Sequence, residues 1–248
     1  MAVTANIPVL GKSIQVLEAL ASGTSHRSVA ELARGLGIAP ATCWRILKTL
    51  ERADWVRPES GGGYGLSLGL LPLVEPLRRY ESLASRWQGV LEELARATGL
   101  SVKLSVAVGD EAATVARAES PRAMSLSGRV GARFPLAVGS SGASLLSVRD
   151  DAAVEAVIAG SPESVWRHQS ARDVRARVRQ VRRTGVCADR GSYHPQVYSL
   201  STCVRDAVRG EVVAITLLGL PDEMTPRAVK AWTALLKRAA KPAGRRAA

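Results

Sequence analysis

A helix-turn-helix pattern near the N-terminus is the feature that most constrains what this chain can fold into. Ser28 stands three residues before Glu31, which is the spacing of a capping box at the start of a helix. Gly37 can adopt the left-handed conformation that ends such a helix, and Pro40 suits the first turn of the next helix because its missing N–H has no partner there. A tight turn therefore joins two short helices. We predict these helices over about 28–36 and 40–53.

The flanking segments extend this pattern into a small independent unit. Apolar residues recur at three- and four-residue steps over 12–21, which predicts a first helix. Short strands at 55–57 and 64–66 enclose the glycines 61–63, as in a β-hairpin. Three helices followed by such a hairpin form a winged helix-turn-helix. We place this unit at 7–70.

The third predicted helix separates an apolar side from a basic, hydrogen-bonding side. A helix that recognises DNA needs this division, because one side packs on its scaffold while donors reach base edges and cations reach phosphates. In isolation the pattern would also suit an ordinary surface helix, but the capped helix before it and the wing after it favour DNA. Arg45 is the best candidate for reading a base, and Lys48 and Arg52 suit phosphates. The candidate residues for double-stranded DNA are Ser28, Thr42, Trp44, Arg45, Lys48, Thr49, Arg52 and Tyr64.

The remaining sequence predicts a second, larger domain. Prolines interrupt the apolar stretch after the wing, and a long helix over about 77–98 ends at Gly99, so we assign 71–98 to a linker and long helix. Two alternating segments flank Gly109 and Asp110, which is the turn chemistry of a β-hairpin. The domain over 99–242 is therefore predicted to be α+β with a mainly antiparallel sheet. The expected strands are 102–108, 113–118, 186–189, 198–205 and 211–218, and the expected helices are 142–148, 150–159, 171–183 and 225–240.

Composition bounds the class of protein more loosely. The formal net charge of +12 favours a polyanionic partner, either nucleic acid or an acidic membrane surface. Basic clusters at 172–183 and 237–246 are interpreted as a solvated helix face and a frayed terminus. No apolar run reaches the roughly 18 residues of a membrane span and no export signal is visible, so we expect a cytoplasmic chain without a membrane partner. Its three cysteines are expected to be reduced thiols.

The order of these elements resembles a known family of regulators. The stretches GKSIQVLEALASG, SVAELARGLGIAPATCWRILKTLERADWV and GGYGLSLG resemble the winged helix-turn-helix of IclR-type transcriptional regulators. LEELARATGLSV, RVGARFPLAVGSSGASLLS, RRTGVCADRG and VRDAVRGEVVAITLLG resemble landmarks of that family's effector-binding domain. The resemblance covers about 7–240. It implies a sequence-specific DNA-binding regulator with a GAF-like α/β domain, acting as a homodimer that often pairs into a homotetramer. Because one winged helix reads too few base pairs to find one site in a genome, we expect two of them to act on a pseudo-palindromic operator.

Ser140 and Ser141 give the first indication of a ligand site. We expect them directly before a helix, where free N–H groups and hydroxyls at its positive end can dock a carboxylate. Either serine could instead be only an N-cap. The resemblance implies that this loop, an Asp on the strand starting at Val186 and alternate residues of the last two strands line the cavity for a small-molecule effector, which we expect to be an organic acid. The implied residues are Ser140, Ser141, Asp189, Val197, Ser199, Thr216 and Leu218.

Three positions depart from the family's pattern. Trp44 stands where relatives usually have a smaller, histidine- or tyrosine-sized residue, so the base preference cannot be transferred. Ala143 replaces a usual long polar or basic residue, and Ser192 stands where an acidic one is common. A regulator that has lost effector binding therefore stays open as an alternative.

Other chemistries are weaker interpretations. A thiol-based redox sensor using Cys187 and Cys203 is the main alternative, and zinc bound by these cysteines with His194 is a minor one. No catalytic frame and no phosphate-binding glycine motif is recognisable. We therefore expect no enzyme activity, no cofactor and no metal site.

Overall fold

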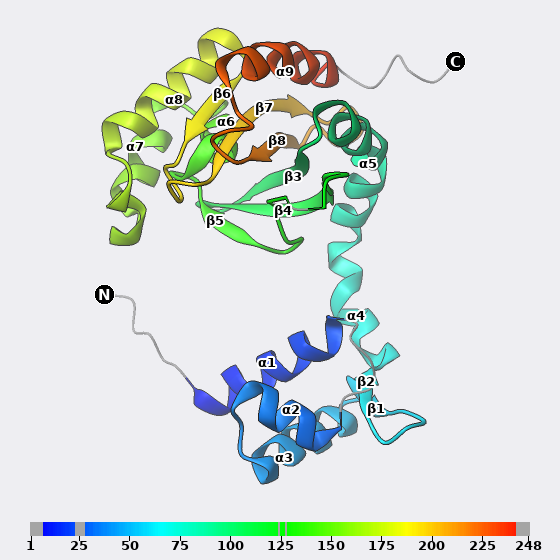
Figure 1. Ribbon diagram of the computed structural model, residues 1–248. Helices are drawn as coiled ribbons and strands as arrows, with labels where there is room; N and C mark the ends of the chain where they lie inside the picture. The colour runs from blue at the N-terminus through cyan, green and yellow to red at the C-terminus, as the bar shows by residue number, and fades with distance from the viewer. Residues whose placement is uncertain (1–6, 23–27, 124, 127, 242–248) are drawn as a thin grey trace. The chain divides into compact units, whose positions relative to one another are not determined.

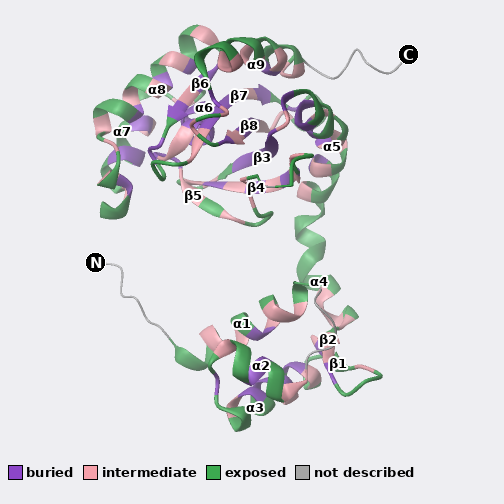
Figure 2. Cartoon of the chain, in the orientation of Figure 1, coloured by how far each residue is buried: buried purple, intermediate pink, exposed green. Residues whose placement is uncertain are grey.

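The computed structural model describes residues 7–22, 28–123, 125–126 and 128–241, and the chain divides into two compact units, 1–79 and 80–248 (Figure 1). The division falls within 71–98, the stretch predicted to be a linker and long helix. Each unit has its own buried core (Figure 2). Residue 242, the expected end of the second domain, and the tail cations Arg245 and Arg246 lie outside the described residues.

The N-terminal unit is the predicted helix-turn-helix with its wing. In helix α2 the Ser28 hydroxyl accepts the N–H of Glu31, whose carboxylate accepts the N–H of Ser28, and Gly37 ends the helix at φ 63°. The first strand of the wing begins one residue later than predicted, because the N–H of Trp55 still donates to Leu50 at the end of α3. The elements are α1 (Pro8–Ala21), α2 (Val29–Leu36), α3 (Pro40–Arg52), β1 (Val56–Pro58) and β2 (Tyr64–Leu66).

The core of this unit holds the apolar side of α3 against α1 and α2. Leu32, Cys43 and Leu47 are fully buried there, with Val16 from α1. Truncating one such leucine to alanine typically costs about 2–5 kcal/mol of unfolding free energy. The apolar side of α3 is therefore fixed, and its other side faces outward.

A segmented stretch leads out of the wing. It consists of η1 (Leu68–Leu70), α4 (Leu71–Val74) and η2 (Glu75–Leu77), followed by the long helix α5 (Arg78–Thr98). Pro72 and Pro76 lie in the first turns of α4 and η2, where a missing N–H breaks no helical hydrogen bond. The prolines therefore divide this stretch into short helical pieces.

The C-terminal unit is built on one six-stranded sheet in the order β5-β4-β3-β8-β7-β6, and every neighbouring pair is antiparallel, as predicted. Helices α5 and α9 pack on one face and helices α6, α7 and α8 on the other. The strands are β3 (Ser101–Val108), β4 (Glu111–Ala118), β5 (Arg133–Pro135), β6 (Cys187–Arg190), β7 (Tyr198–Arg205) and β8 (Val212–Gly219), and the helices are α6 (Gly139–Leu146), α7 (Asp151–Gly160), η3 (Glu163–Arg167), α8 (Ala171–Thr184) and α9 (Pro226–Ala239).

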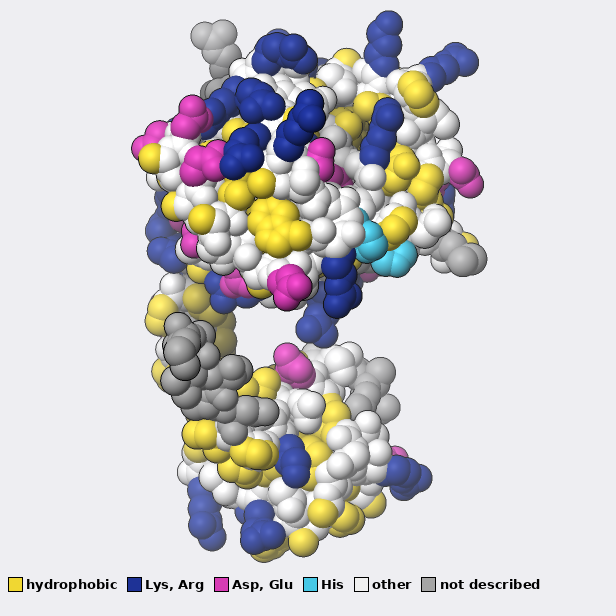
Figure 3. Space-filling model, turned by 90° about the vertical axis from the view of Figure 1, so that its left-hand side faces the viewer, with side chains coloured by type: hydrophobic (Ala, Val, Ile, Leu, Met, Phe, Trp, Pro, Cys, Tyr) yellow, Lys and Arg dark blue, Asp and Glu magenta, His cyan; other side chains and the backbone are white. Residues whose placement is uncertain are grey.

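The arginines of α8 form a solvated face, as their spacing indicated. Arg175 pairs with Glu155 at 2.6 Å and Arg182 with Asp151 at 2.5 Å, which links α8 to α7 through exposed ion pairs. Basic and acidic side chains lie next to each other on this face of the unit (Figure 3). Arg177 differs, because its side chain turns inward and is only 11% exposed.

The start of α6 corrects the sequence analysis. The helix begins at Gly139, three residues before the predicted start, so Ser140 and Ser141 lie inside its first turn. No local side chain caps it; the hydroxyl of Ser192, which follows β6, accepts the N–H of Gly139 at 3.0 Å. Because this partner lies 53 positions away in the sequence, a local capping rule cannot predict it. Strand β5 and helix η3 were also absent from the prediction.

Candidate functional site

The outward side of α3 carries the predicted DNA-contacting residues. Trp44, Arg45, Thr49 and Arg52 are exposed, and Thr42 is half-buried in the first turn. The Arg45 guanidinium lies back along the helix and donates to the carbonyl of Ala41 at 3.3 Å. That contact leaves the other guanidinium donors of Arg45 available to a base or phosphate.

Three other candidates already have intramolecular partners. Lys48 donates to Glu51 at 2.7 Å. The Glu51 carboxylate and, to a smaller extent, the Tyr64 hydroxyl raise the pKa of the Lys48 ammonium. Tyr64 is half-buried against the core of the unit. Ser28 is engaged in the capping box of α2. A phosphate contact by Lys48 therefore competes with Glu51, and the observed role of Ser28 is to start the helix.

A cavity of about 250 Å³ lies in the C-terminal unit between the start of α6 and the sheet. Ser199, Thr216 and Leu218 line it from the two adjacent strands β7 and β8. Ser140 was expected to line the cavity but does not, because its hydroxyl is fully buried and donates to Ser199 at 2.7 Å. The expected residues that line the cavity are Ser141, Asp189, Val197, Ser199, Thr216 and Leu218.

Strand register explains why these residues meet. Leu218 lies opposite Ser199 across β8 and β7, and Ser199 lies opposite Asp189 across β7 and β6, so the three form one row. The next row begins with Lys103 opposite Thr216, whose hydroxyl donates to Ser201 at 3.0 Å. Alternation along antiparallel strands places both rows on the face toward α6. The opposite face buries Leu104, Ile215 and Leu217 in the core with α5 and α9.

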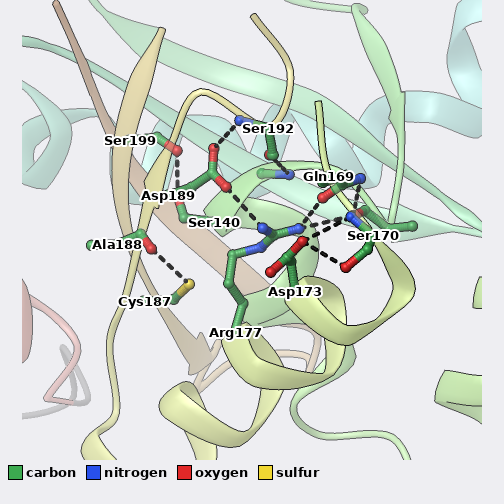
Figure 4. A network of polar contacts seen from close by, with 12 residues as sticks. Ser140, Gln169, Ser170, Asp173, Arg177, Cys187, Ala188, Asp189, Ser192 and Ser199 are labelled. Carbon is green, nitrogen blue, oxygen red and sulfur yellow. Dashed lines mark hydrogen bonds and ion pairs between the residues drawn. The ribbon is translucent and has the colours of Figure 1, made fainter. Parts of the chain in front are cut away.

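Asp189 is held by an internal network beside the cavity (Figure 4). Its Oδ1 lies 3.1 Å from Arg177 Nη1, and its Oδ2 accepts the N–H of Ser192 at 3.2 Å. Arg177 also donates to the Gln169 amide oxygen and to the carbonyl of Ala137. The carboxylate of Asp189 is therefore already paired with a cation, although one side of the residue faces the cavity.

Lys103 is the cavity residue that the sequence analysis missed. It lies on the central strand β3, is 7% exposed, and its Nζ stands 4.8 Å from the centroid of the Phe134 ring. Burial lowers the pKa of its ammonium to about 8. The sequence signal was ambiguous, because the alternation of Ser101, Lys103 and Ser105 with apolar residues also suits a solvated face of the strand. Phe134, Tyr193, Val138 and Gly139 also line the cavity without having been predicted.

Glycine is required within the first turn of α6. A Cβ on Gly142 would lie 2.1 Å from the carbonyl oxygen of Leu136, so no other residue allows this close approach. The turn is thereby held against the chain entering the helix, with Ser141 facing the cavity. The N–H groups of Ser140 and Ser141 belong to the first turn, where an α-helix offers no internal acceptor. The positive end of α6 therefore borders the cavity.

The cysteines have little of the chemistry that a thiol sensor needs. Cys187 is fully buried, and burial raises the pKa of its thiol to about 12, so the reactive thiolate is scarce near neutral pH. Cys203 is half-buried beside the Ser147 hydroxyl. Among the described residues, no group of three or more His, Cys, Asp or Glu side chains is placed to hold a metal ion. No described helix is long and apolar enough to cross a membrane.

Comparison with known proteins identifies the two units. Residues 9–60 match the family model of the IclR helix-turn-helix domain, and residues 79–244 match the C-terminal domain of the bacterial transcriptional regulator IclR. The chain belongs to the IclR family. It is thus a transcription regulator with an N-terminal helix-turn-helix that binds DNA and a C-terminal effector-binding domain, as the sequence analysis predicted.

Individual relatives agree with this assignment. The transcriptional repressor AllR of Klebsiella pneumoniae is 23% identical over 221 residues, covering 88% of this chain and 81% of AllR. The crystal structure of Thermotoga maritima IclR matches with a TM-score of 0.72 at 17% identity, covering 95% of this chain and 96% of that one. An IclR homologue from Microbacterium hydrocarbonoxydans, crystallised with 4-hydroxybenzoate, matches with a TM-score of 0.68 at 18% identity, covering 94% of this chain and 95% of that one. These relatives are regulators.

Two of the three departures from the IclR pattern, Ala143 and Ser192, lie in the C-terminal unit. Ala143 is buried in the core beneath α6 and does not line the cavity. Ser192 supplies the hydroxyl that caps α6 and an N–H that holds Asp189. With a serine at this position, the cap is neutral and leaves the positive end of α6 without an acidic side chain from residue 192.

Proposed function

We propose that this IclR-type regulator is controlled by a small organic acid that binds in the cavity between α6 and the sheet. The observation that carries the proposal is the convergence, on one cavity, of the first turn of α6 and the hydroxyls of Ser141, Ser199 and Thr216. The positive end of a helix favours an anion, and the hydroxyls can orient further polar groups of the ligand. Val197 and Leu218 supply apolar walls.

The size and lining of the cavity agree with this class of ligand. Its volume of about 250 Å³ is compatible with a small acid, and Phe134 and Tyr193 line it with two rings in edge-to-face contact at 5.2 Å. A regulator of the same fold is known in complex with 4-hydroxybenzoate, an aromatic acid. An organic acid with an apolar or aromatic body is therefore the first class to test.

The variant Ser141→Glu tests the assigned cavity. It places a negative charge against the docking carboxylate, so it should abolish the thermal shift produced by a bound acid while leaving operator binding without ligand nearly intact. Ser141→Ala, which keeps the N–H, should weaken the response only partly. Val130→Glu adds the same charge at an exposed site and serves as the matched control. An acid that protects the Ser141→Glu protein as well as the wild type would show that the cavity is wrongly assigned.

We further propose that the regulator acts as a homodimer, with pairing into tetramers as a second step, on a pseudo-palindromic operator. One winged helix contacts too few base pairs to select one site in a genome, so two should act together. The exposed apolar side chains of the stretch before α5 support pairing. These are Leu68, Leu71, Leu73, Val74 and Leu77.

Light scattering with footprinting tests this assembly. We expect a dimer or larger species at micromolar concentration, and two protected half-sites on DNA that the purified protein retains from its own genome. Leu71→Lys together with Leu77→Lys should weaken both, because each charge would be buried in the contact. A monomer with and without DNA would rule out the dimer.

A further inference from the structure

Lys103 presents a buried charge that lacks an anionic partner among the described residues. The side chain is 7% exposed and lies on β3, between β4 and β8 in the sheet. Of the residues that the structure describes, none gives its ammonium a hydrogen-bond acceptor or a carboxylate, and the ammonium stands over the face of Phe134, 4.8 Å from the ring centroid. Buried charges are normally paired, because an unpaired one is costly to desolvate.

The carboxylate of Asp189, which lines the same cavity, already has a positively charged partner. Asp189 is 4% exposed, and its two oxygens interact with Arg177 at 3.1 Å and with the N–H of Ser192 at 3.2 Å. Arg177 does not line the cavity; it lies behind Asp189 on α8. The charges of Asp189 and Arg177 therefore cancel, and the cavity keeps the positive charge of Lys103.

Apolar groups surround the aliphatic part of the Lys103 side chain and exclude water from it, and the cavity lies beside these groups. A Cβ on Gly128 would lie 3.2 Å from Lys103 Cδ and 3.7 Å from Leu218 Cδ1, so the backbone of residue 128 approaches the lysine stem closely. Phe134 and Leu218 complete an apolar wall around it. An ammonium in such surroundings interacts with an anion more strongly than one in water does.

We propose that Lys103 is the counter-ion of the effector and makes the cavity selective for carboxylates over neutral molecules of the same shape. This inference rests on the proposed function and deepens it, because it names the side chain that recognises the charge. The carboxylate accepts hydrogen bonds from the ammonium of Lys103 on the sheet side, within reach of the positive end of α6. The body of the ligand then extends along Phe134 and Leu218.

Paired acids and amides test this selectivity on the full-length protein. The probes are benzoate, 4-hydroxybenzoate, phenylacetate and acetate, each with its primary amide, and binding is measured by calorimetry or ligand-observed NMR at pH 7. We expect at least one acid to bind the wild type, and its amide to bind at least tenfold more weakly. Lys103→Met should remove most of that preference, whereas Lys103→Arg should retain it. Arg117→Met, which removes a cation from the position opposite Lys103 on β4, is the control and should keep the preference.

The outcomes separate this inference from the function on which it rests. If an acid binds Lys103→Met as tightly as the wild type, while Ser141→Glu abolishes binding, the proposed function stands and Lys103 is not the counter-ion. If no acid of the set binds the wild type, both fail. Lys103→Met keeps an unbranched apolar side chain only one atom shorter, and cooperative thermal unfolding of the variant would show that any loss of binding is local.

Discussion

Asp189 and Arg177 form a buried ion pair, 3.1 Å apart, which joins strand β6 beside the cavity to helix α8. Asp189 lines both this cavity and a more open depression on its other side, which Arg177 also lines. The pair therefore forms part of the wall that closes the cavity toward α8. The side chains of Asp189 and Arg177 are 3% and 11% exposed. If one of them is removed, water cannot fully solvate the charge of the other.

We predict that Asp189→Asn lowers the free energy of unfolding by about 3–5 kcal/mol, because Arg177 would be left as a buried, uncompensated cation. Urea denaturation of the purified variant and of the wild type measures this difference in unfolding free energy. Glu155→Gln breaks the exposed pair between Glu155 of α7 and Arg175 of α8 and should cost much less, because water solvates both charges. Equal losses in the two variants would mean that the Asp189 pair is as solvated as a surface pair.

The sequence predicted those parts of the molecule that depend on local rules. The capping box at Ser28, the left-handed Gly37 and the division of α3 into two sides follow from neighbouring residues, and the alternation of β7 and β8 places Ser199, Thr216 and Leu218 on one face. Contacts distant in sequence escaped prediction. Ser192 caps α6 at Gly139, so Ser140 lies inside the helix and not before it. The hydroxyl of Ser140 donates to Ser199.

Lys103 escaped prediction for a different reason. Its strand was recognised, but the alternation of Ser101, Lys103 and Ser105 could equally describe a solvated face, and only the packing of α6 makes it interior. The short strand β5 was missed because three residues carry too little periodicity to distinguish a strand from a loop.

The pH dependence of stability should report on Lys103. Burial lowers its pKa to about 8 in the folded protein, against 10.5 for a solvated lysine. The unfolded chain therefore binds more protons between these values, and stability should rise with pH there. Lys103→Met should remove this rise. In the wild type the free energy of unfolding should rise by at most about 3 kcal/mol. Denaturation midpoints from pH 7.5 to 10.5 measure it. Equal slopes in both proteins would show that folding does not lower the pKa of Lys103.

Ligand affinity should follow the opposite trend. A carboxylate favours the ammonium form of Lys103, so its affinity should fall above pH 8, approaching about tenfold per unit once the amine of the free protein is neutral. Asp189 and Tyr193 line the same cavity and Arg117 lies opposite on β4, so the Lys103→Met protein is the necessary reference. Calorimetry at pH 7, 8 and 9 provides the comparison. A decline that persists in Lys103→Met would have another origin.

On α3, Arg45→Ala should weaken operator binding by about 1–3 kcal/mol and relax the preference at one base pair, because a guanidinium can bond two acceptors of guanine at once. Its contact with Ala41 is a single bond within the helix, so the loss should come from DNA. Gel shifts on operator variants measure both effects. Unchanged affinity and preference would remove Arg45 from base recognition.

Lys48→Ala should weaken all DNA sequences alike and make the salt dependence shallower by about one unit of slope, as the loss of one phosphate contact does. Glu51→Gln provides the complementary variant. It releases Lys48 from its 2.7 Å ion pair, so binding should tighten without a change in sequence preference. Sequence-dependent changes in either variant would argue against a phosphate contact.

Control of DNA binding by an acid in the cavity is tested most directly by titrating operator DNA with and without a bound acid, and by titrating the acid with and without operator. We predict a change of about 5–150-fold in operator affinity and the same factor in acid affinity, because the two binding equilibria are linked. Ser141→Glu should abolish both changes. An acid that binds in the cavity of the wild type but leaves operator affinity unchanged would contradict the account.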